Sequence, residues 1–348
     1  MAPADGHDLL KGLLEAEGLI FLGVASVSAE TSEAKARYRR MLEEGRHGTM
    51  DWMERHEALK YAPAVVVPGT RSLVLAGLNY YQPRSETKNQ GQIARYAWGR
   101  DYHKVMLKKL KHVAVQLAIA FPGNKFRAFT DTSPIDERFW AQEAGAAFTA
   151  RNTLSIRAGL GSWFLLGEIF SSVPFKASPK AAHTHGSCPS SCHRCASACP
   201  TGALEPNGRI DARKCISYLT IEHKGSIALE LRPLMGKWLF GCDLCQEVCP
   251  FNLKAETTRE PEFLSWKAGS TLDLKEILDL ADEEAFTRRF GGSPVHRAGF
   301  QGLRRNACIA AGNGLHTELT STLTRLACGS DEVVAEAAHW ALERFRDN

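Results

Sequence analysis

Residues 188–200 read CPSSCHRCASACP and residues 242–250 read CDLCQEVCP, with one further cysteine, Cys215, between them. Both stretches contain the spacing Cys-x2-Cys-x3-Cys-Pro, and the first has an additional cysteine, Cys188, separated from Cys192 by three residues. The repeated spacing is typical of bacterial ferredoxins that bind two [4Fe–4S] clusters, in which the cysteine before proline crosses to the other cluster. Eight of the ten cysteines are therefore predicted to be cluster ligands.

The crossing rule divides these cysteines into two sets of four. Cluster one is predicted to use Cys188, Cys192, Cys195 and Cys249, and cluster two Cys199, Cys215, Cys242 and Cys245. A zinc ribbon does not require the trailing Cys-Pro, and disulfides are rare in the cytoplasm, so both alternatives are weak. The two remaining cysteines, Cys308 and Cys328, lie on expected helices and are predicted to be buried, small apolar side chains.

The bulk composition is that of an ordinary globular protein, with 348 residues, 44% hydrophobic and 24% charged residues, and a net charge of +4. This length permits two or three domains. The sequence shows neither an export signal nor an apolar run long enough to span a membrane, so we expect a cytoplasmic protein. About 180 residues precede the first cysteine, far more than an electron carrier needs. We expect this leading part to hold the site where the electrons are used.

Periodicity predicts a mixture of strands and helices in the first half and helices in the last part. Residues 18–27 and 73–81 are expected strands, and residues 104–120 an expected helix. Residues 130–134 look like a strand end that leads into a helix, with Ser133 as N-cap and Pro134 as its first residue. Helices are also expected over residues 303–313 and 317–328, followed by one whose apolar face carries Val334, Ala338, Ala341 and Phe345. These short helices with Gly-containing turns suggest a small helical repeat.

Motifs along nearly the whole chain resemble the epoxyqueuosine reductase family. The stretches that carry the resemblance are residues 95–103 (RYAWGRDYH), 131–134 (DTSP), 152–154 (NTL), 161–164 (GSWF), 167–169 (GEI), 199–203 (CPTGA), 211–222 (DARKCISYLTIE), 231–236 (LRPLMG), 241–245 (GCDLC) and 304–307 (RRNA). Each short stretch alone is weak, but together they are highly specific.

The resemblance implies the last step of queuosine formation, in which epoxyqueuosine at the wobble position of a tRNA loses its epoxide oxygen as water. It also implies an α+β multidomain protein with three parts. These are a mixed α/β cobalamin-binding catalytic domain over residues 1–180, a ferredoxin-like two-cluster domain over 181–255, and a C-terminal HEAT-like helical domain over 256–348 that contacts tRNA. The clusters would deliver electrons from an unidentified low-potential donor to the cobalamin, in a monomer that needs no membrane.

The resemblance also assigns roles to individual residues. Asp131 stands at the position of the family's proton donor, although from the residues alone it could simply order the turn before Pro134. A carboxylic acid that donates a proton near neutral pH needs burial or a negative neighbour. The expected cobalamin contacts are Arg55, Tyr96, Asp131, Ser155, Leu166 and Ser217. Arg55 and Tyr96 could equally be packing or surface residues. The Asp-x-His-x-x-Gly motif that supplies a histidine to cobalt is absent, because Met106 stands where its glycine would be.

The sequence departs from the family pattern in two places. Residues 148–152 read FTARN where the family usually shows an aromatic residue, a glycine and a lysine before the asparagine, so that Arg151 replaces the lysine. The other departure is the spacing between Cys188 and Cys192, which has one residue more than usual.

Residues 288–305 contain five arginines and no acid, and Arg297, Arg304 and Arg305 are predicted to contact tRNA phosphates. A solvated basic face is the alternative. Two other functions compete with the tRNA reductase. One is a corrinoid reductase of a small molecule, similar to reductive dehalogenases, and the other is a non-catalytic electron carrier or corrinoid-reactivating protein. Corrinoid content and dependence on tRNA distinguish the three.

Overall fold

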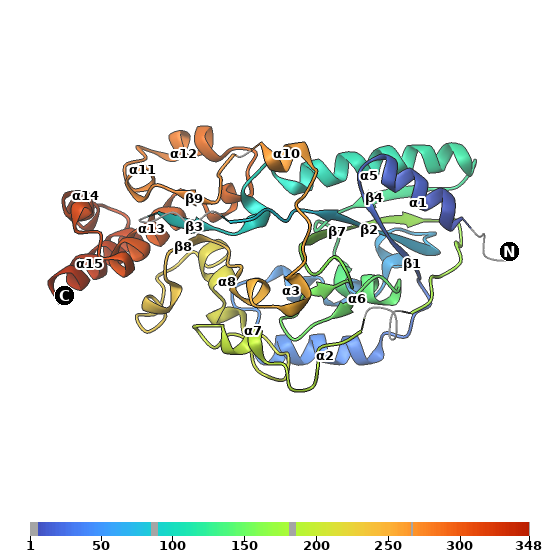
Figure 1. The fold of residues 1–348 in the computed structure, drawn as a ribbon, viewed down its shortest axis with the longest axis horizontal. Coiled ribbons are helices and arrows are strands. Elements are labelled where there is room, and N and C mark those ends of the chain that lie inside the picture. The colour runs from blue at the N-terminus through green and yellow to red at the C-terminus, as the bar shows by residue number, and fades with distance from the viewer. Residues whose placement is uncertain (1–5, 85–89, 181–185, 266, 348) are drawn as a thin grey trace.

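The computed structural model describes residues 6–84, 90–180, 186–265 and 267–347. The molecule is elongated, with a sheet and its covering helices toward one end and the C-terminal helices at the other (Figure 1). The segment that contains the eight clustered cysteines lies between these two ends. In the part of the chain that is described, no helix is both long and apolar enough to cross a membrane.

A four-stranded antiparallel sheet, in the order β1-β2-β7-β4, forms the centre of the N-terminal part. Its strands are β1 (Ile20–Ser26), β2 (Ser72–Asn79), β4 (Phe126–Phe129) and β7 (Phe164–Ser171). The first two confirm the strands predicted over residues 18–27 and 73–81. β2 and β7 lie in the middle of the sheet and are buried along most of their length, which explains why β2 reads as a continuous apolar run.

Helices cover both faces of this sheet. α1 (His7–Ala16) and α5 (Tyr102–Ala120) pack on one face, and α6 (Glu137–Glu143) packs on the other. α5 confirms the helix predicted over residues 104–120. It begins after Asp101, whose carboxylate accepts a hydrogen bond from the backbone N–H of His103. The other helices of the N-terminal part are α2 (Ser32–Glu43), α3 (Trp52–Arg55) and α4 (Pro63–Val66).

The predicted start of the helix after β4 is wrong by three residues. α6 begins at Glu137 rather than Pro134, and its N-cap is Asp136, whose carboxylate accepts from the backbone N–H of Phe139 at 3.1 Å. Ser133 does not cap the helix, because its hydroxyl instead donates to the buried carboxylate of Glu168 at 2.7 Å. Ser133 therefore binds a residue of a distant strand instead of capping α6.

The middle of the chain consists of short elements. A hairpin of β5 (Phe148–Thr149) and β6 (Ser155–Ile156) precedes the cysteines, and a second sheet has the order β8-β3-β9. The strands of that sheet are β3 (Gly91–Ile93), β8 (Trp238–Phe240) and β9 (Thr271–Leu272). The helices are α7 (Arg194–Ser197), α8 (Ile216–Ile221) and α9 (Leu244–Glu247), and α7 packs against α9. Each of these two helices contains one of the clustered cysteines.

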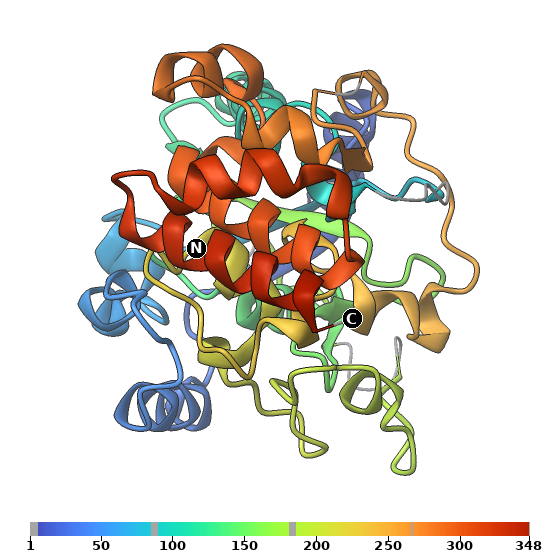
Figure 2. The ribbon, with the colours of Figure 1, turned by 90° about the vertical axis from the view of Figure 1, so that its left-hand side faces the viewer.

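The last part of the chain is helical, as predicted (Figure 2). Its helices are α10 (Pro261–Leu264), α11 (Leu274–Leu278), α12 (Glu283–Phe290), α13 (Phe300–Gly314), α14 (Thr320–Ala327) and α15 (Glu332–Arg346). α15 packs against both α13 and α14 through small residues such as Ala338 and Ala341. Cys308 is buried in α13, as predicted, whereas the prediction for Cys328 is wrong. Cys328 follows the end of α14 and is exposed there.

The C-terminal hydrophobic core is not built from C-terminal residues alone. It also includes Ile93 and Trp98 from the N-terminal half and Phe240 from β8, because β3 pairs with β8 and β9. The division into units at residues 180 and 255 remains a prediction. The first boundary borders residues 181–185, which lie outside the described ranges.

Candidate active site and cluster centre

Two cavities share one wall, and Asp131 lies on it. We call the first, of about 450 Å³, the inner cavity, and the second, of about 800 Å³, the outer cavity. Both are lined by Tyr96, Tyr102 and Asp131. The inner cavity is also lined by Glu137, Ser155, Leu166, Ser217, Cys215, Cys242 and Cys245, and the outer one by Trp52, His103, Glu222, His296 and Arg297.

The structure thereby brings together five of the six predicted cobalamin contacts. Tyr96, Ser155, Leu166 and Ser217 come from four separate segments and lie on the inner cavity together with Asp131. Arg55 does not line either cavity among the described residues, and is exposed at the end of α3. Its neighbour in that helix, Trp52, lines the outer cavity instead.

The backbone around Asp131 is held in an unusual conformation. Asp131 follows β4 with φ of +52°, in the left-handed region that most side chains avoid. Its backbone N–H donates to Oε1 of Glu137 at 2.5 Å, and the preceding hydroxyl of Thr130 donates to the carbonyl of Leu166 at 2.8 Å. Strained residues of this kind concentrate at functional sites. These two contacts aim the Asp131 side chain at the wall between the cavities.

The Asp131 carboxylate belongs to a short chain of hydrogen bonds. Its Oδ2 accepts from the Tyr102 hydroxyl at 2.7 Å and lies 3.1 Å from Nε2 of His103. The other ring nitrogen of His103, Nδ1, lies 2.7 Å from Oδ1 of Asp101. Burial lowers the pKa of His103, but the hydrogen bonds to the two carboxylates outweigh it and raise the pKa to about 9. His103 is therefore a cation between two carboxylates at neutral pH.

The protonation state of Asp131 differs from what a simple proton donor requires. Burial raises the pKa of its carboxyl, but the hydrogen bonds from His103 and Tyr102 and the charge of Arg297 hold that pKa below its ordinary value. The Asp131 side chain is 58% exposed, because it faces two cavities. The proton of this pair consequently resides on His103, whose Nε2 lies 3.1 Å from Oδ2 of Asp131. His103 and Tyr102 belong to the family motif of residues 95–103, but sequence reasoning gave them no role.

The electrostatic neighbours of the clustered cysteines follow the predicted grouping only in part, because Cys195 of predicted cluster one also acts on Cys245 of predicted cluster two. Burial raises the pKa of Cys249, and the thiols of Cys188, Cys195 and Cys192 raise it further. Burial likewise raises the pKa of Cys242, with a contribution from its neighbour Cys215. In the described ranges, no three or more His, Cys, Asp or Glu side chains converge tightly enough to hold a single metal ion. The grouping therefore remains a prediction from the sequence pattern.

A buried ion-pair network lies behind the cluster-two cysteines. Asp243, between Cys242 and Cys245, is 2% exposed, and its Oδ2 accepts from Arg84 at 2.8 Å and from Arg95 at 2.9 Å. Arg95 also donates to Glu247 at 2.6 Å. Since such pairs are costly to break, the network ties the cysteine loop to the N-terminal half of the chain.

The comparisons with known proteins agree with this site. Residues 60–132 match the family model described as "Epoxyqueuosine reductase QueG, DUF1730", and residues 188–252 match the "4Fe-4S double cluster binding domain". The epoxyqueuosine reductase of Vibrio cholerae is 37% identical over 330 residues, which cover 93% of this chain and 88% of that protein. The enzyme of Pseudomonas aeruginosa is also 37% identical, over 99% of this chain and 96% of its own length. The chain belongs to the epoxyqueuosine reductase family.

Solved structures of epoxyqueuosine reductases share this fold. One, determined with an epoxyqueuosine-modified tRNA-Tyr stem loop, has a TM-score of 0.86 and 26% identity, and the match covers 98% of this chain and 91% of that one. Another, from Bacillus subtilis, is described with its catalytic aspartate loop swung out of the active site. The double-cluster match supports two iron–sulfur clusters in this chain.

The two departures from the epoxyqueuosine reductase pattern contact each other. The Arg151 guanidinium donates to the carbonyls of Pro189 at 2.8 Å and Ser190 at 3.1 Å, and also to the carbonyl of Cys192. These carbonyls belong to the loop with the extra residue between Cys188 and Cys192. The backbone N–H of Arg151 also donates to the Cys188 sulfur at 3.4 Å. Arginine, with its fork of donors, thus holds a loop that is longer than usual.

The inner cavity has properties expected of a pocket for a polar cofactor. The Ser155 hydroxyl is buried there without a hydrogen-bond partner among the described residues. Thr153, also on the wall, has φ of +65°. A buried hydroxyl without a partner costs free energy, and a polar ligand or a water molecule in the cavity would satisfy it. The cavity residues therefore fit the cobalamin that the family resemblance implies.

The three predicted tRNA contacts differ in position. Arg297 is exposed at the outer cavity, where its guanidinium lies 5.4 Å from the Trp52 ring centre and pairs with Glu222. Arg304 is half-buried and donates to the carbonyl of Leu280 at 2.5 Å. The prediction for Arg305 is wrong, because its side chain is 1% exposed. Its guanidinium donates instead to the carbonyls of Leu219, His223 and Gly225.

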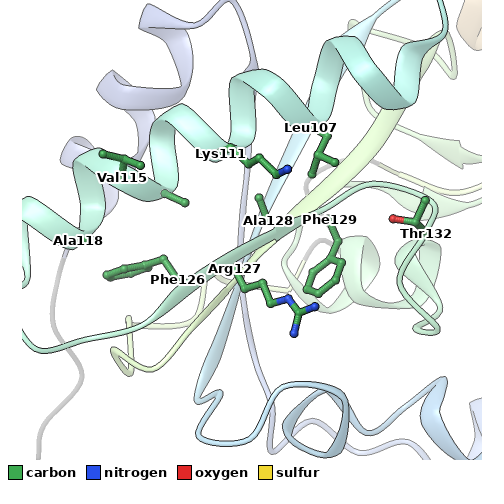
Figure 3. A pocket seen from close by; sticks show the side chains of 10 residues that line it. Leu107, Lys111, Val115, Ala118, Phe126, Arg127, Ala128, Phe129 and Thr132 are labelled. Carbon is green, nitrogen blue, oxygen red and sulfur yellow. The ribbon is translucent and has the colours of Figure 1, made fainter. Parts of the chain in front are cut away.

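A third cavity lies beside the active site, between α5 and β4 (Figure 3). Its volume is about 650 Å³, and its lining runs from Val115 on α5 to Thr132, next to Asp131. Leu107 and Lys111 face it from the helix and Arg127 from the strand. β4 is the edge strand of the sheet, so this cavity follows an open sheet edge. It contains none of the predicted site residues.

Proposed function

We propose that this protein reduces epoxyqueuosine in a tRNA anticodon to queuosine. The observation that carries the proposal is the position of Asp131 between two cavities, one lined by three cluster-two cysteines and the other by Arg297 and Trp52. In this arrangement, the cysteines that would deliver electrons and the cavity that would receive the substrate lie on opposite sides of the Asp131 carboxylate. Membership of the epoxyqueuosine reductase family and the solved complex of a relative with a modified stem loop support the same reaction.

The inner cavity would hold the cobalamin, which supplies a strongly reducing metal centre for the epoxide. Tyr96 and Leu166 would pack against it, and the unpartnered hydroxyl of Ser155 would donate to it. Ser217 lines the cavity together with Cys215, in the helix that follows this cluster-two ligand. Arg55 would contact a peripheral part of the cofactor from α3. Cluster two, through Cys215, Cys242 and Cys245, would lie nearest to this pocket and cluster one behind it.

Asp131 would deliver a proton to the oxygen of the opening epoxide. The proton comes from His103 Nε2, 3.1 Å away, while Asp101 holds the opposite ring nitrogen and Tyr102 orients the Asp131 carboxylate. The depressed pKa of Asp131 rises as the neighbouring oxygen becomes negative and His103 gives up its proton. General-acid catalysis of this kind contributes about 10²–10⁴-fold.

The outer cavity would receive the modified nucleotide. Single-stranded anticodon bases are recognised by stacking on aromatic or guanidinium planes, and Trp52 with Arg297 provides both. Residues 256–348, a HEAT-like unit in this proposal, would carry Arg297 and Arg304 toward the tRNA backbone. Residues 1–180 would form the cobalamin domain and residues 181–255 the two-cluster domain of a monomer. An unidentified low-potential donor would reduce the clusters.

The test uses anaerobically reconstituted protein, with and without cobalamin and a reductant, and tRNA that contains epoxyqueuosine. Digested nucleosides are analysed by mass spectrometry. We expect loss of one oxygen mass only when cobalamin is present. Protein loaded with clusters and cobalamin that leaves epoxyqueuosine unchanged would contradict the proposal and favour reduction of a small molecule.

A further inference from the structure

A buried acid lies in the middle of the central sheet, behind the inner cavity. Glu168 is on β7, between β2 and β4, and its side chain is completely buried. Oε1 accepts from the Ser133 hydroxyl at 2.7 Å, whereas Oε2 has no partner among the described residues. A buried carboxylate oxygen without a donor is costly. Oε2 therefore needs a donor, and a proton held between Glu168 and a second carboxyl group would supply one.

The carboxyl group that faces Glu168 is that of Glu137, the first residue of α6. Glu137 lines the inner cavity, and its Oε1 accepts from the backbone N–H of Asp131 at 2.5 Å. The two carboxyl groups are neighbours, and each acts on the pKa of the other through a side-chain hydrogen bond. Two ionised carboxylates cannot form that bond, but a carboxylic acid and a carboxylate can. One proton shared by Glu137 and Glu168 satisfies the open oxygen.

The surroundings favour keeping that proton at neutral pH. Burial and the charge of Glu168 raise the pKa of Glu137 well above its usual value, and Asp131 raises it further. Burial raises the pKa of Glu168 to about 7. The other ionisable groups that face the pair are Tyr102 from α5 and Lys60, whose pKa burial lowers. A pair of this kind titrates as a unit, with one proton bound over the neutral range.

The proposed reaction needs two protons, and the hydrogen-bond chain of Asp131 stores only one, on His103. Two C–O bonds break, a C=C bond forms, and the oxygen leaves as water with two electrons from the clusters and two protons. We propose that Glu137 and Glu168 hold the second proton in a shared hydrogen bond and return it to the Asp131 carboxylate after the first transfer. This inference rests on the proposed function. The pair changes from acid–carboxylate to two carboxylates, and solvent reprotonates it through the cavity.

The first test is independent of turnover. Infrared spectra of the full chain with its clusters, without substrate, should contain the C=O band of a protonated carboxyl at pH 7, shifted in D₂O. We expect Glu137→Gln and Glu168→Gln each to abolish this band, because the new amide donates to the remaining carboxylate. Glu143→Gln is the matched control, since Glu143 ends the same helix and is ion-paired with Lys180. A band that survives in both variants would overturn the inference.

The second test separates proton supply from structure. In single-turnover reduction of epoxyqueuosine tRNA, Glu137→Gln should slow product formation at least about tenfold, with intact cluster absorbance. The wild-type rate should decline only above the neutral range, where the pair loses its shared proton, and this decline should be absent in Glu168→Gln. A wild-type rate and pH profile in both variants would refute the proton store. If the wild type itself converts no epoxyqueuosine, the proposed function fails, and the infrared band still decides whether the proton is held.

Discussion

Removing the Arg151 side chain should destabilise cluster one and leave cluster two intact. The Arg151 guanidinium donates to three carbonyls in the loop between Cys188 and Cys192, in which residues 189–191 are exposed. In Arg151→Ala the backbone N–H that donates to the Cys188 sulfur is kept, so the variant tests the side chain alone.

The size of the effect on the loop follows from the three hydrogen bonds that the Arg151 side chain donates. A hydrogen bond from a charged donor contributes about 1.5–3 kcal/mol, but two of these are exposed and count for less. Together they hold the loop by about 2–3 kcal/mol. Since about 1.4 kcal/mol is a factor of ten, the open loop becomes roughly 30- to 100-fold more populated. Arg151→Lys keeps the charge but lacks the planar fork of donors that the guanidinium presents to the loop, so we expect about a tenfold effect.

The assay is iron release from anaerobic, fully loaded protein to a ferrous chelator. When loop opening is fast relative to iron capture, the rate follows the open population. We therefore expect two phases in Arg151→Ala, with half of the iron released roughly 30- to 100-fold faster than in the wild type. Arg37→Ala is the matched control, because Arg37 forms only an exposed pair with Glu33 on α2.

Two results would refute this reasoning. One is release of all iron from Arg151→Ala at the wild-type rate, which would mean that the loop is held by its cluster alone. The other is equal acceleration for both clusters, which would indicate global destabilisation rather than local opening.

Four further outcomes are expected. Because the pKa of His103 is raised to about 9, its contribution to stability is complete below pH about 6.5 and is lost as pH rises through about 9. The difference in urea-unfolding free energy between wild type and His103→Gln should therefore shrink across that window. Arg305→Ala should lower stability by about 3 kcal/mol or more, seen as a fall in Tm that Arg288→Ala does not show, because one buried and two part-buried carbonyls lose their donor. Arg297→Ala should weaken tRNA binding and reduce the salt slope by about one, measured by titration at several salt concentrations. Ser155→Ala should lower cobalamin affinity about fivefold without destabilising the substrate-free protein, which absorbance titration and thermal unfolding would show.

Local pattern predicted the features that depend on neighbouring residues. The helix over residues 104–120 was predictable because its apolar residues recur at helical spacing beside the N-cap Asp101. The cysteine pattern predicted two clusters because ligand spacing follows from the geometry of a cubane held by a short loop. The start of α6 could not be predicted in this way. Ser133 is a good N-cap by type, yet its hydroxyl is bound to Glu168, 35 residues further along the chain.

Electrostatic properties at the site also escaped local reasoning. Asp131 was expected to need a raised pKa, but contact with His103 and Tyr102 lowers it. The raised pKa values belong to Glu137 and Glu168, which were not singled out because an isolated glutamate carries no signal of burial. Of the two, only Glu168 could have been recognised from the sequence. It stands among apolar residues of a strand, and an acid at the centre of a buried strand needs a partner.

By itself the sequence determined that this chain binds two iron–sulfur clusters, folds as a mixed α/β protein with a helical end, and resembles one family. Such information resides in spacing, periodicity and motif identity, which are properties of neighbouring residues. Only the tertiary structure decided that Arg305 is a core residue rather than a phosphate contact, and that Arg151 holds the longer cysteine loop. Both side chains bond carbonyls that are distant in sequence, at least 38 residues away for Pro189 and 80 for Gly225. Which arginine reaches solvent and which is buried depends on how the elements pack, and composition alone does not contain that information.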